Sequence, residues 1–198
     1  AWCWKAGTTS GIDATGADIT PSAYSFNQTS GFSILKYTGA GSAGDLLAHG
    51  LANVPHVIII KSTALNGTGR VYHKGIASDA ETDRLDTVEV DAAVDSASQW
   101  NDTAPTSVLL TLGADSDVNH SGGTYVNFGY VFTSIQGFSK FGAFEGNGNA
   151  DGTFVYTGFR PALVITKSVD STSPWHMFDN KREGYNVDND ALDLTETT

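Results

Sequence analysis

The feature of this sequence that most constrains its fold is an internal repeat. Residues 31–62 and residues 137–168 both begin with Gly-Phe-Ser and end with Lys-Ser, and Pro55 of the first copy matches Pro161 of the second. The offset is 106 residues at both ends of the match. Self-similarity at a fixed spacing indicates repeated structural units. The sequence therefore predicts two related units, and we expect Ile59 to superpose on Ile165.

Both copies carry the signals of β-strands. Phe32–Thr38 alternates and ends in a glycine-rich turn, while Val57–Ile60 is a β-branched run suited to a strand buried on both faces. Further strands are predicted at Val71–His73, Val108–Leu112, Tyr125–Thr133 and Trp175–Asp179. Helical spacing is scarce, and Asp45–Leu51 is predicted to be loop or strand. We predict an all-β sandwich of the jelly-roll or concanavalin type, built from two pseudo-repeats offset by about 106 residues.

The repeat also suggests boundaries and a core. Residues 1–112 would form the first repeat, with a loop insert at 8–29, and residues 113–198 a second, incomplete repeat packed against it. Ala1–Trp4 resembles Asn127–Tyr130, so we expect the chain to be a segment of a longer or processed protein. No second-copy equivalent of Trp100–Ser134 is present, which leaves two possibilities: further chain, or two copies that complete each other. The predicted core residues are Ile58, Ile60, Val164 and Phe138.

Composition excludes several classes of protein. Apolar residues make up 40% of the 198 residues, enough for a real core, and charged residues only 17%. The net charge of −11 would repel a phosphate backbone, so no nucleic-acid partner is expected. The single cysteine, Cys3, cannot form an internal disulfide, and no apolar run is long enough to insert in a membrane.

Catalytic motifs are not found. Ser33 and Ser139 lack the last glycine of a nucleophile elbow, and the five histidines do not have zinc-site spacing. Glu81–Asp86 resembles the acidic strand of retaining jelly-roll glucanases, but its sixth residue is Asp instead of Glu. Charges that protect an edge strand explain the same pattern better. We predict no catalytic residues and a protein that is not an enzyme.

One loop suggests a metal. Asp115, Asp117 and Asn119 place oxygen atoms at alternate positions, a spacing that suits Ca²⁺. The loop lacks the glycine and glutamate of an EF-hand, and ordinary turn chemistry explains the same residues. Calcium is thus a possible cofactor bound by these three residues, with no other cofactor expected. The tryptophans could stack on sugars, although core packing is the simpler interpretation, so the ligand-binding residues are unknown.

Several blocks together resemble a domain of bacteriophage tail fibre and related virion structural proteins. They are residues 31–51, 55–62, 71–75, 100–108, 126–168 and 175–182. The resemblance extends from Ala1 to about Asn186. It implies a location at the virion surface and a lectin-like β-sandwich, and it supplies no catalytic residues.

The resemblance leads to one function and two alternatives. A surface fibre or spike module would attach the particle to the host by binding cell-surface glycan, as a homo-oligomer, by analogy a trimer, in contact with other virion proteins. A capsid decoration or cement protein would use the same rigid sandwich to stabilise the virion. A glycan-degrading tailspike enzyme is the less favoured alternative.

Overall fold

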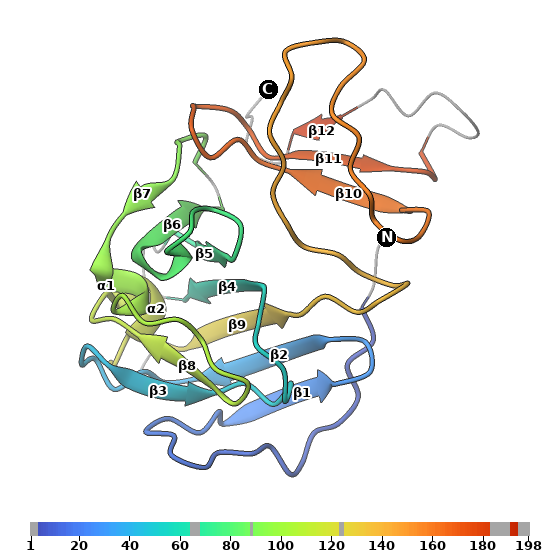
Figure 1. The fold of residues 1–198 in the computed structure, drawn as a ribbon. Helices are drawn as coiled ribbons and strands as arrows, with labels where there is room; N and C mark the ends of the chain where they lie inside the picture. Colours follow the sequence, from blue (N-terminus) through green and yellow to red (C-terminus); the bar gives the residue numbers. More distant parts are fainter. Residues whose placement is uncertain (1–3, 64–67, 88, 123–124, 183–190, 194–198) are drawn as a thin grey trace.

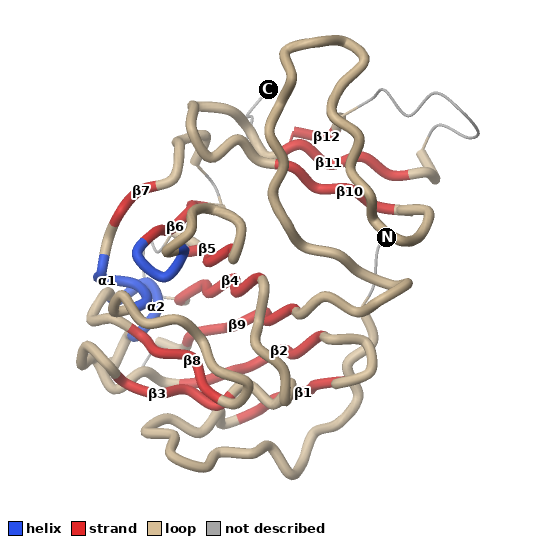
Figure 2. The backbone as a smooth tube through the Cα atoms, viewed as in Figure 1, coloured by secondary structure: helices blue, strands red, loops and turns tan. Residues whose placement is uncertain are grey.

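The computed structural model describes residues 4–63, 68–87, 89–122, 125–182 and 191–193. Strands dominate these residues, and helices are short (Figures 1 and 2). The strands are β1 Ala23–Asn27, β2 Phe32–Tyr37, β3 Asp45–Ala48, β4 Val57–Ser62, β5 Arg70–His73, β6 Asp83–Asp86, β7 Val94–Asp95, β8 Leu109–Leu112, β9 Asn127–Phe132, β10 Leu163–Thr166, β11 His176–Asp179 and β12 Leu192–Asp193. The helices are the 3₁₀ turn η1 Ala80–Thr82, α1 Ala97–Trp100 and α2 Ser116–Asn119.

A seven-stranded antiparallel sheet forms the body of the protein. Its strand order is β1-β2-β9-β4-β5-β6-β7, and a second sheet, β3-β8, is seen in front of it in Figure 1. Apolar side chains of both sheets share one buried cluster, to which β2 contributes Leu35, β4 Ile58 and β8 Leu110. The predicted all-β, sandwich-like fold is therefore confirmed.

Strand β4 is buried on both faces, as its β-branched run predicts. Ile58 and Ile60 lie in the core between the sheets, as expected. Val57 and Ile59 point to the opposite face, where a second apolar cluster includes Phe141 and Trp175 from the C-terminal part of the chain. Segments far apart in sequence thus cover both sides of one strand.

Two expectations about the first repeat need correction. Residues 8–29 are not only a loop, because β1 lies at their end and pairs with β2 from Ala23↔Lys36 to Asn27↔Phe32. The boundary at residue 113 does not follow the sheets, because β9 lies between β2 and β4 at the centre of the large sheet. Its alternating pattern identifies a strand but carries no information on which neighbours it will join.

The C-terminal part forms a separate three-stranded sheet in the order β10-β11-β12. Figure 1 shows it apart from the large sheet, with a long loop between β9 and β10 running beside it. Val164 is 41% exposed and Phe138 is 55% exposed, so their predicted burial is wrong. The equivalent residues of the first repeat are buried because Ile58 packs in the cluster between the two sheets and Phe32 stacks on Phe132 of β9.

Candidate functional site

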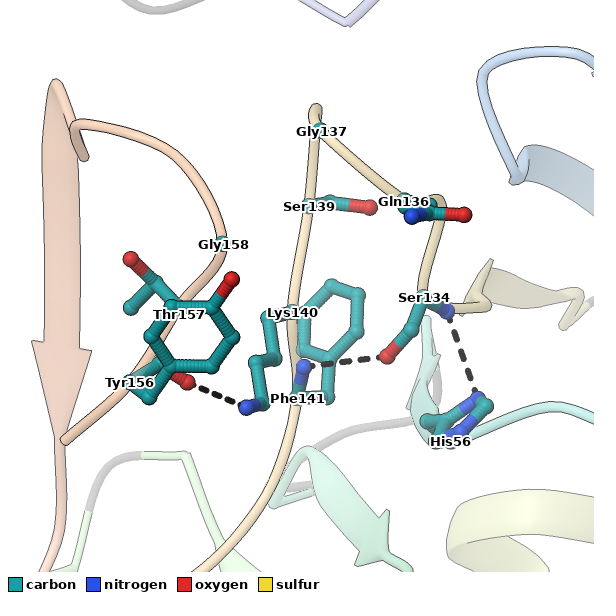
Figure 3. Close-up of a pocket in the computed structure, with 10 residues that line it drawn as sticks. All are labelled: His56, Ser134, Gln136, Gly137, Ser139, Lys140, Phe141, Tyr156, Thr157 and Gly158. Atoms are coloured by element: carbon teal, nitrogen blue, oxygen red, sulfur yellow. Dashed lines mark hydrogen bonds between the residues drawn. The ribbon is translucent and has the colours of Figure 1, made fainter.

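A pocket of about 430 Å³ lies beside the second Gly-Phe-Ser turn (Figure 3). Residues that follow β9, from Ser134 to Phe141, form one wall, and residues 156–158, which precede β10, form the other. His56, just before β4, closes the base. The pocket therefore lies where the large sheet meets the long loop of the second repeat.

Hydrogen bonds hold the wall next to the large sheet in place. The Ser134 hydroxyl accepts a bond of 3.1 Å from the Phe141 amide, and the Ser134 amide donates a bond of 3.3 Å to Nδ1 of His56. The Ser139 hydroxyl accepts from the Ile135 amide at 3.2 Å. Phe141 packs on Phe132 of β9 with their ring centroids 5.7 Å apart. This wall is built before any ligand binds.

The facing wall is more open and carries the aromatic surface. Tyr156 is 71% exposed, and the Nζ of Lys140 lies 5.6 Å from the centre of its ring. Lys140 also donates a hydrogen bond to the carbonyl oxygen of Tyr156. The lysine thus joins the two walls and places a cation beside an exposed aromatic ring.

His56 gives the pocket a neutral polar group. Burial lowers the pKa of His56, and the charge of Lys74 lowers it further, so the imidazole is uncharged at neutral pH. Nδ1 of His56 lies 3.3 Å from the Ser134 amide, which donates to it, and 3.1 Å from the Thr133 hydroxyl. None of the ten lining residues is Asp or Glu, and a glycosidase mechanism with two carboxylates therefore has no support in this pocket.

The predicted calcium ligands do not converge. Asp115 is the N-cap of α2 and accepts from the Asp117 amide at 2.8 Å. The Asp117 carboxylate instead forms an ion pair of 2.7 Å with Arg70. A calcium ion at this position would have to displace the guanidinium, and the protein contacts do not fit the predicted site.

Asn119, the third predicted ligand, is buried, and its side chain forms several hydrogen bonds to other parts of the protein. Its Oδ1 accepts from the Ala40 amide at 3.0 Å and from the Gly41 amide at 3.2 Å. Its Nδ2 donates to the Gly113 carbonyl at 2.9 Å and to the Asp45 carboxylate at 2.8 Å. The described residues contain no cluster of three or more His, Cys, Asp or Glu side chains that could hold a metal ion.

The glucanase-like acidic residues do not form one strand face. Glu81 lies in η1, while Asp83 and Asp86 lie in β6. Asp86 is held by Arg70 at 2.5 Å and by Arg84. Burial raises the pKa of Asp83, and the charges of Asp79 and Asp95 raise it further. These contacts tie β6 to β5, and β6 pairs with both β5 and β7, so the interpretation of these residues as a solvated edge-strand cluster is also wrong.

A family model described as "Domain of unknown function (DUF7483)" matches residues 1–198. The chain belongs to this family. No curated protein and no solved structure matches it. Among the described residues, no helix is long and apolar enough to cross a membrane.

Sequence reasoning did not identify the pocket. Its polar groups, His56, Ser134 and Lys140, come from two segments about 80 residues apart and form no motif. A usable signal was the segment Phe154–Tyr156, whose two aromatic residues align with Ala48 and Gly50 of the first copy. That difference indicates a role for the second repeat beyond core packing.

Proposed function

We propose that this chain is a non-catalytic structural module of a phage virion surface, and that the pocket beside Tyr156 binds a host cell-surface glycan. The sequence resemblance to tail fibre domains supports the location. The chemistry of the pocket supports the ligand. The observation that carries the proposal is the exposed Tyr156 ring facing a wall of fixed hydroxyl and amide groups.

Each part of the pocket matches a part of a sugar. An exposed aromatic ring offers a flat apolar surface for the C–H face of a pyranose. The side chains of Gln136 and Thr157 and the Nε2 of His56 offer donors and acceptors for ring hydroxyls. Because Tyr156 and Gln136 lie on opposite walls, one sugar ring can contact the aromatic face and a polar side chain at the same time.

Lys140 narrows the class of glycan. It is the cationic side chain among the lining residues of a protein whose net charge is −11. A sugar that carries a carboxylate or phosphate would pair with its ammonium group, whereas other acidic surfaces of the protein would repel it. We therefore propose an acidic oligosaccharide of the host envelope as the ligand.

Binding of host envelope oligosaccharides, neutral and acidic, measured by calorimetry tests this proposal. Tyr156→Ala should weaken binding about tenfold, which corresponds to the loss of one stacked ring. Lys140→Met should weaken binding of acidic glycans more than binding of neutral ones, because it removes the charge as well as the contact with Tyr156. Phe154→Ala is the matched control, because Phe154 is 86% exposed on the same loop but does not line the pocket.

Three outcomes would contradict the proposal. Unchanged affinity in Tyr156→Ala would remove the pocket from the binding site. Release of reducing ends from the glycan, lost in Glu81→Gln, would show a tailspike enzyme. Localisation on intact particles by cross-linking and mass spectrometry would reveal a capsid decoration protein if the chain contacted only capsid subunits.

A further inference from the structure

The long loop between β9 and β10 projects away from the sheets (Figure 1) and contains two asparagines, Asn147 and Asn149, with similar contacts. The Oδ1 of Asn147 accepts from the Asn149 amide at 3.0 Å, and the Oδ1 of Asn149 accepts from the Asp151 amide at 3.1 Å. Each side chain thus bonds the backbone two residues further on, which defines an Asx turn. The two turns differ in the residue that follows the asparagine.

That residue is glycine in the first turn and alanine in the second. Gly148 is exposed, and a Cβ built on it would meet no heavy atom within 4 Å. Its amide donates to no acceptor among the contacts of the described residues. Because glycine has no Cβ to shield its nitrogen, the Gly148 amide is open to reaction, whereas the methyl group of Ala150 hinders the equivalent amide.

Asn147 and Gly148 supply the two reactants of a cyclisation. The Gly148 nitrogen is a nucleophile once it has lost its proton, and the side-chain carbonyl carbon of Asn147 is an electrophile one residue away. The hydrogen bond from the Asn149 amide to Oδ1 polarises this carbonyl and stabilises the negative charge that develops on its oxygen during attack. The loop therefore holds an open nucleophile beside an activated electrophile.

We propose that Asn147 is a site of spontaneous covalent modification, at which a succinimide forms with Gly148 and opens to aspartate or isoaspartate. The bond from the Gly148 nitrogen to Cγ of Asn147 forms as the Cγ–Nδ2 bond breaks. The Gly148 amide proton leaves with the NH₂ group as ammonia. Water then adds to one of the two ring carbonyls: addition at Cγ gives aspartate, and addition at the backbone carbonyl carbon gives isoaspartate. Water is the only co-reactant.

The modification removes a contact of the loop and adds a charge to it. The Nδ2 of Asn147 donates to the Asp151 carbonyl oxygen at 3.4 Å, and a carboxylate cannot donate in its place. The product carries one further negative charge close to Asp151, in a protein whose net charge is already −11. Isoaspartate also lengthens the backbone by one carbon. We therefore expect the tip of the loop to loosen once Asn147 has reacted.

Incubation of the folded parent protein at neutral and mildly alkaline pH, followed by peptide mapping and mass spectrometry, tests the site. Asn147 should lose ammonia and gain an acid group, faster as the pH rises, because the nucleophile is the deprotonated amide. Asn149 should stay largely intact, as should Asn27, whose Oδ1 accepts from the Thr29 amide at 3.0 Å but which precedes Gln28. An isoaspartyl methyltransferase should methylate the incubated protein and not the fresh protein.

Two substitutions should move the reaction in opposite directions. Gly148→Ala should slow modification of Asn147, because a Cβ then shields the nucleophile. Ala150→Gly should start modification at Asn149, whose side chain already accepts from the Asp151 amide. Gly148 has a φ of +65°, so alanine is strained there, whereas Ala150→Gly introduces no strain. Thermal melting of both variants checks that the fold is unchanged.

A synthetic peptide of residues 145–151 provides the reference rate. If Asn147 stays intact in the folded protein after the peptide has fully converted, the loop holds the two reactants apart and the proposal is wrong. Equal conversion of Asn147 and Asn149 would also overturn it, since Gly148 would then not direct the reaction. Asn66 precedes Gly67 but lies outside the described residues, so peptide mapping must count it separately. Neither Asn147 nor Gly148 lines the pocket, so the result does not depend on glycan binding.

Discussion

The guanidinium of Arg70 in β5 forms an ion pair of 2.7 Å with the Asp117 carboxylate in α2. Both side chains are largely buried, and Arg70 also pairs with Asp86 of β6. One cation thus connects α2 to two strands of the large sheet. This pairing gives Asp117 a structural role that does not depend on a metal.

The first prediction follows from this ion pair. Asp117→Ala should lower the free energy of unfolding by about 1–3 kcal/mol, because it removes a charge-assisted hydrogen bond from a buried cation. The loss should be the same in calcium and in a chelator, as measured by thermal melting. Asp170→Ala, at an exposed loop carboxylate, is the matched control. A melting temperature that falls on chelation in the parent protein, but not in Asp117→Ala, would restore the calcium hypothesis.

The second prediction concerns Asn119. Asn119→Ala should destabilise the protein by about 2–5 kcal/mol, because it leaves the Ala40 and Gly41 amides and the Gly113 carbonyl without a partner. Denaturant unfolding measures the loss. Asn149→Ala, on an exposed loop, should change stability little. A small effect of Asn119→Ala would mean that water replaces the amide without cost.

Asn119 also holds the turn that contains Gly39, a position with no room for a side chain. A Cβ on Gly39 would lie 2.4 Å from the carbonyl carbon of Asn119, well inside contact distance. The backbone at Gly39 cannot shift without breaking the hydrogen bonds from the Ala40 and Gly41 amides to Asn119. Gly39→Ala should therefore destabilise the protein about as much as Asn119→Ala, and the double variant should lose less than the sum because the two residues act on one contact.

The third prediction uses the repeat as its own control. Ile58→Ala should cost about 2–5 kcal/mol in unfolding free energy, because a buried cavity remains. Val164→Ala, at the equivalent position, should cost under about 0.5 kcal/mol, since Val164 is already exposed in the single chain. Equal losses would mean that β10 is covered in the isolated chain.

The strands were largely predictable from sequence, and burial was not. β-branched runs and turn residues locate β4 and β5, and the 106-residue offset then places β10 and β11 correctly. The burial of Ile58 and the exposure of Val164 could not be separated, because the two residues sit in similar local sequence. What differs is the second sheet, β3-β8, whose apolar side chains share the buried cluster with Ile58.

The predicted calcium site shows even more clearly that local sequence does not determine which distant residues a side chain contacts. Asp115, Asp117 and Asn119 alternate as calcium ligands would, but their partners lie at Arg70 and in the turn at Ala40 and Gly41. In a calcium loop the oxygens of neighbouring residues bind the same ion. Here donors from distant parts of the chain bind these oxygens instead. Local spacing alone cannot distinguish these cases.

The last prediction is a pH dependence that arises from His49. This residue is fully buried; the Leu51 amide donates to its Nδ1 at 3.3 Å, and its Nε2 lies 3.2 Å from the Thr106 carbonyl oxygen. Burial lowers the pKa of His49 from 6.5 to about 4, although the contact with Thr106 opposes this change.

The sign follows from proton uptake. Between pH 6.5 and about 4 the unfolded chain binds a proton at His49 that the folded protein does not. Stability from this residue is therefore complete above pH 6.5 and is lost as the pH falls toward 4, by about 3 kcal/mol in total. His56 and His73 also have lowered pKa values, mainly because of burial, and act in the same direction.

The contribution of His49 must consequently be measured as a difference between the parent and His49→Gln, whose side chain does not titrate. The free energy of unfolding of His49→Gln, followed by denaturant titration at several pH values, should fall less steeply below pH 6.5 than that of the parent. Parallel curves for the two proteins would show that His49 takes up its proton in the folded state, and that its bonds to Leu51 and Thr106 do not hold it neutral.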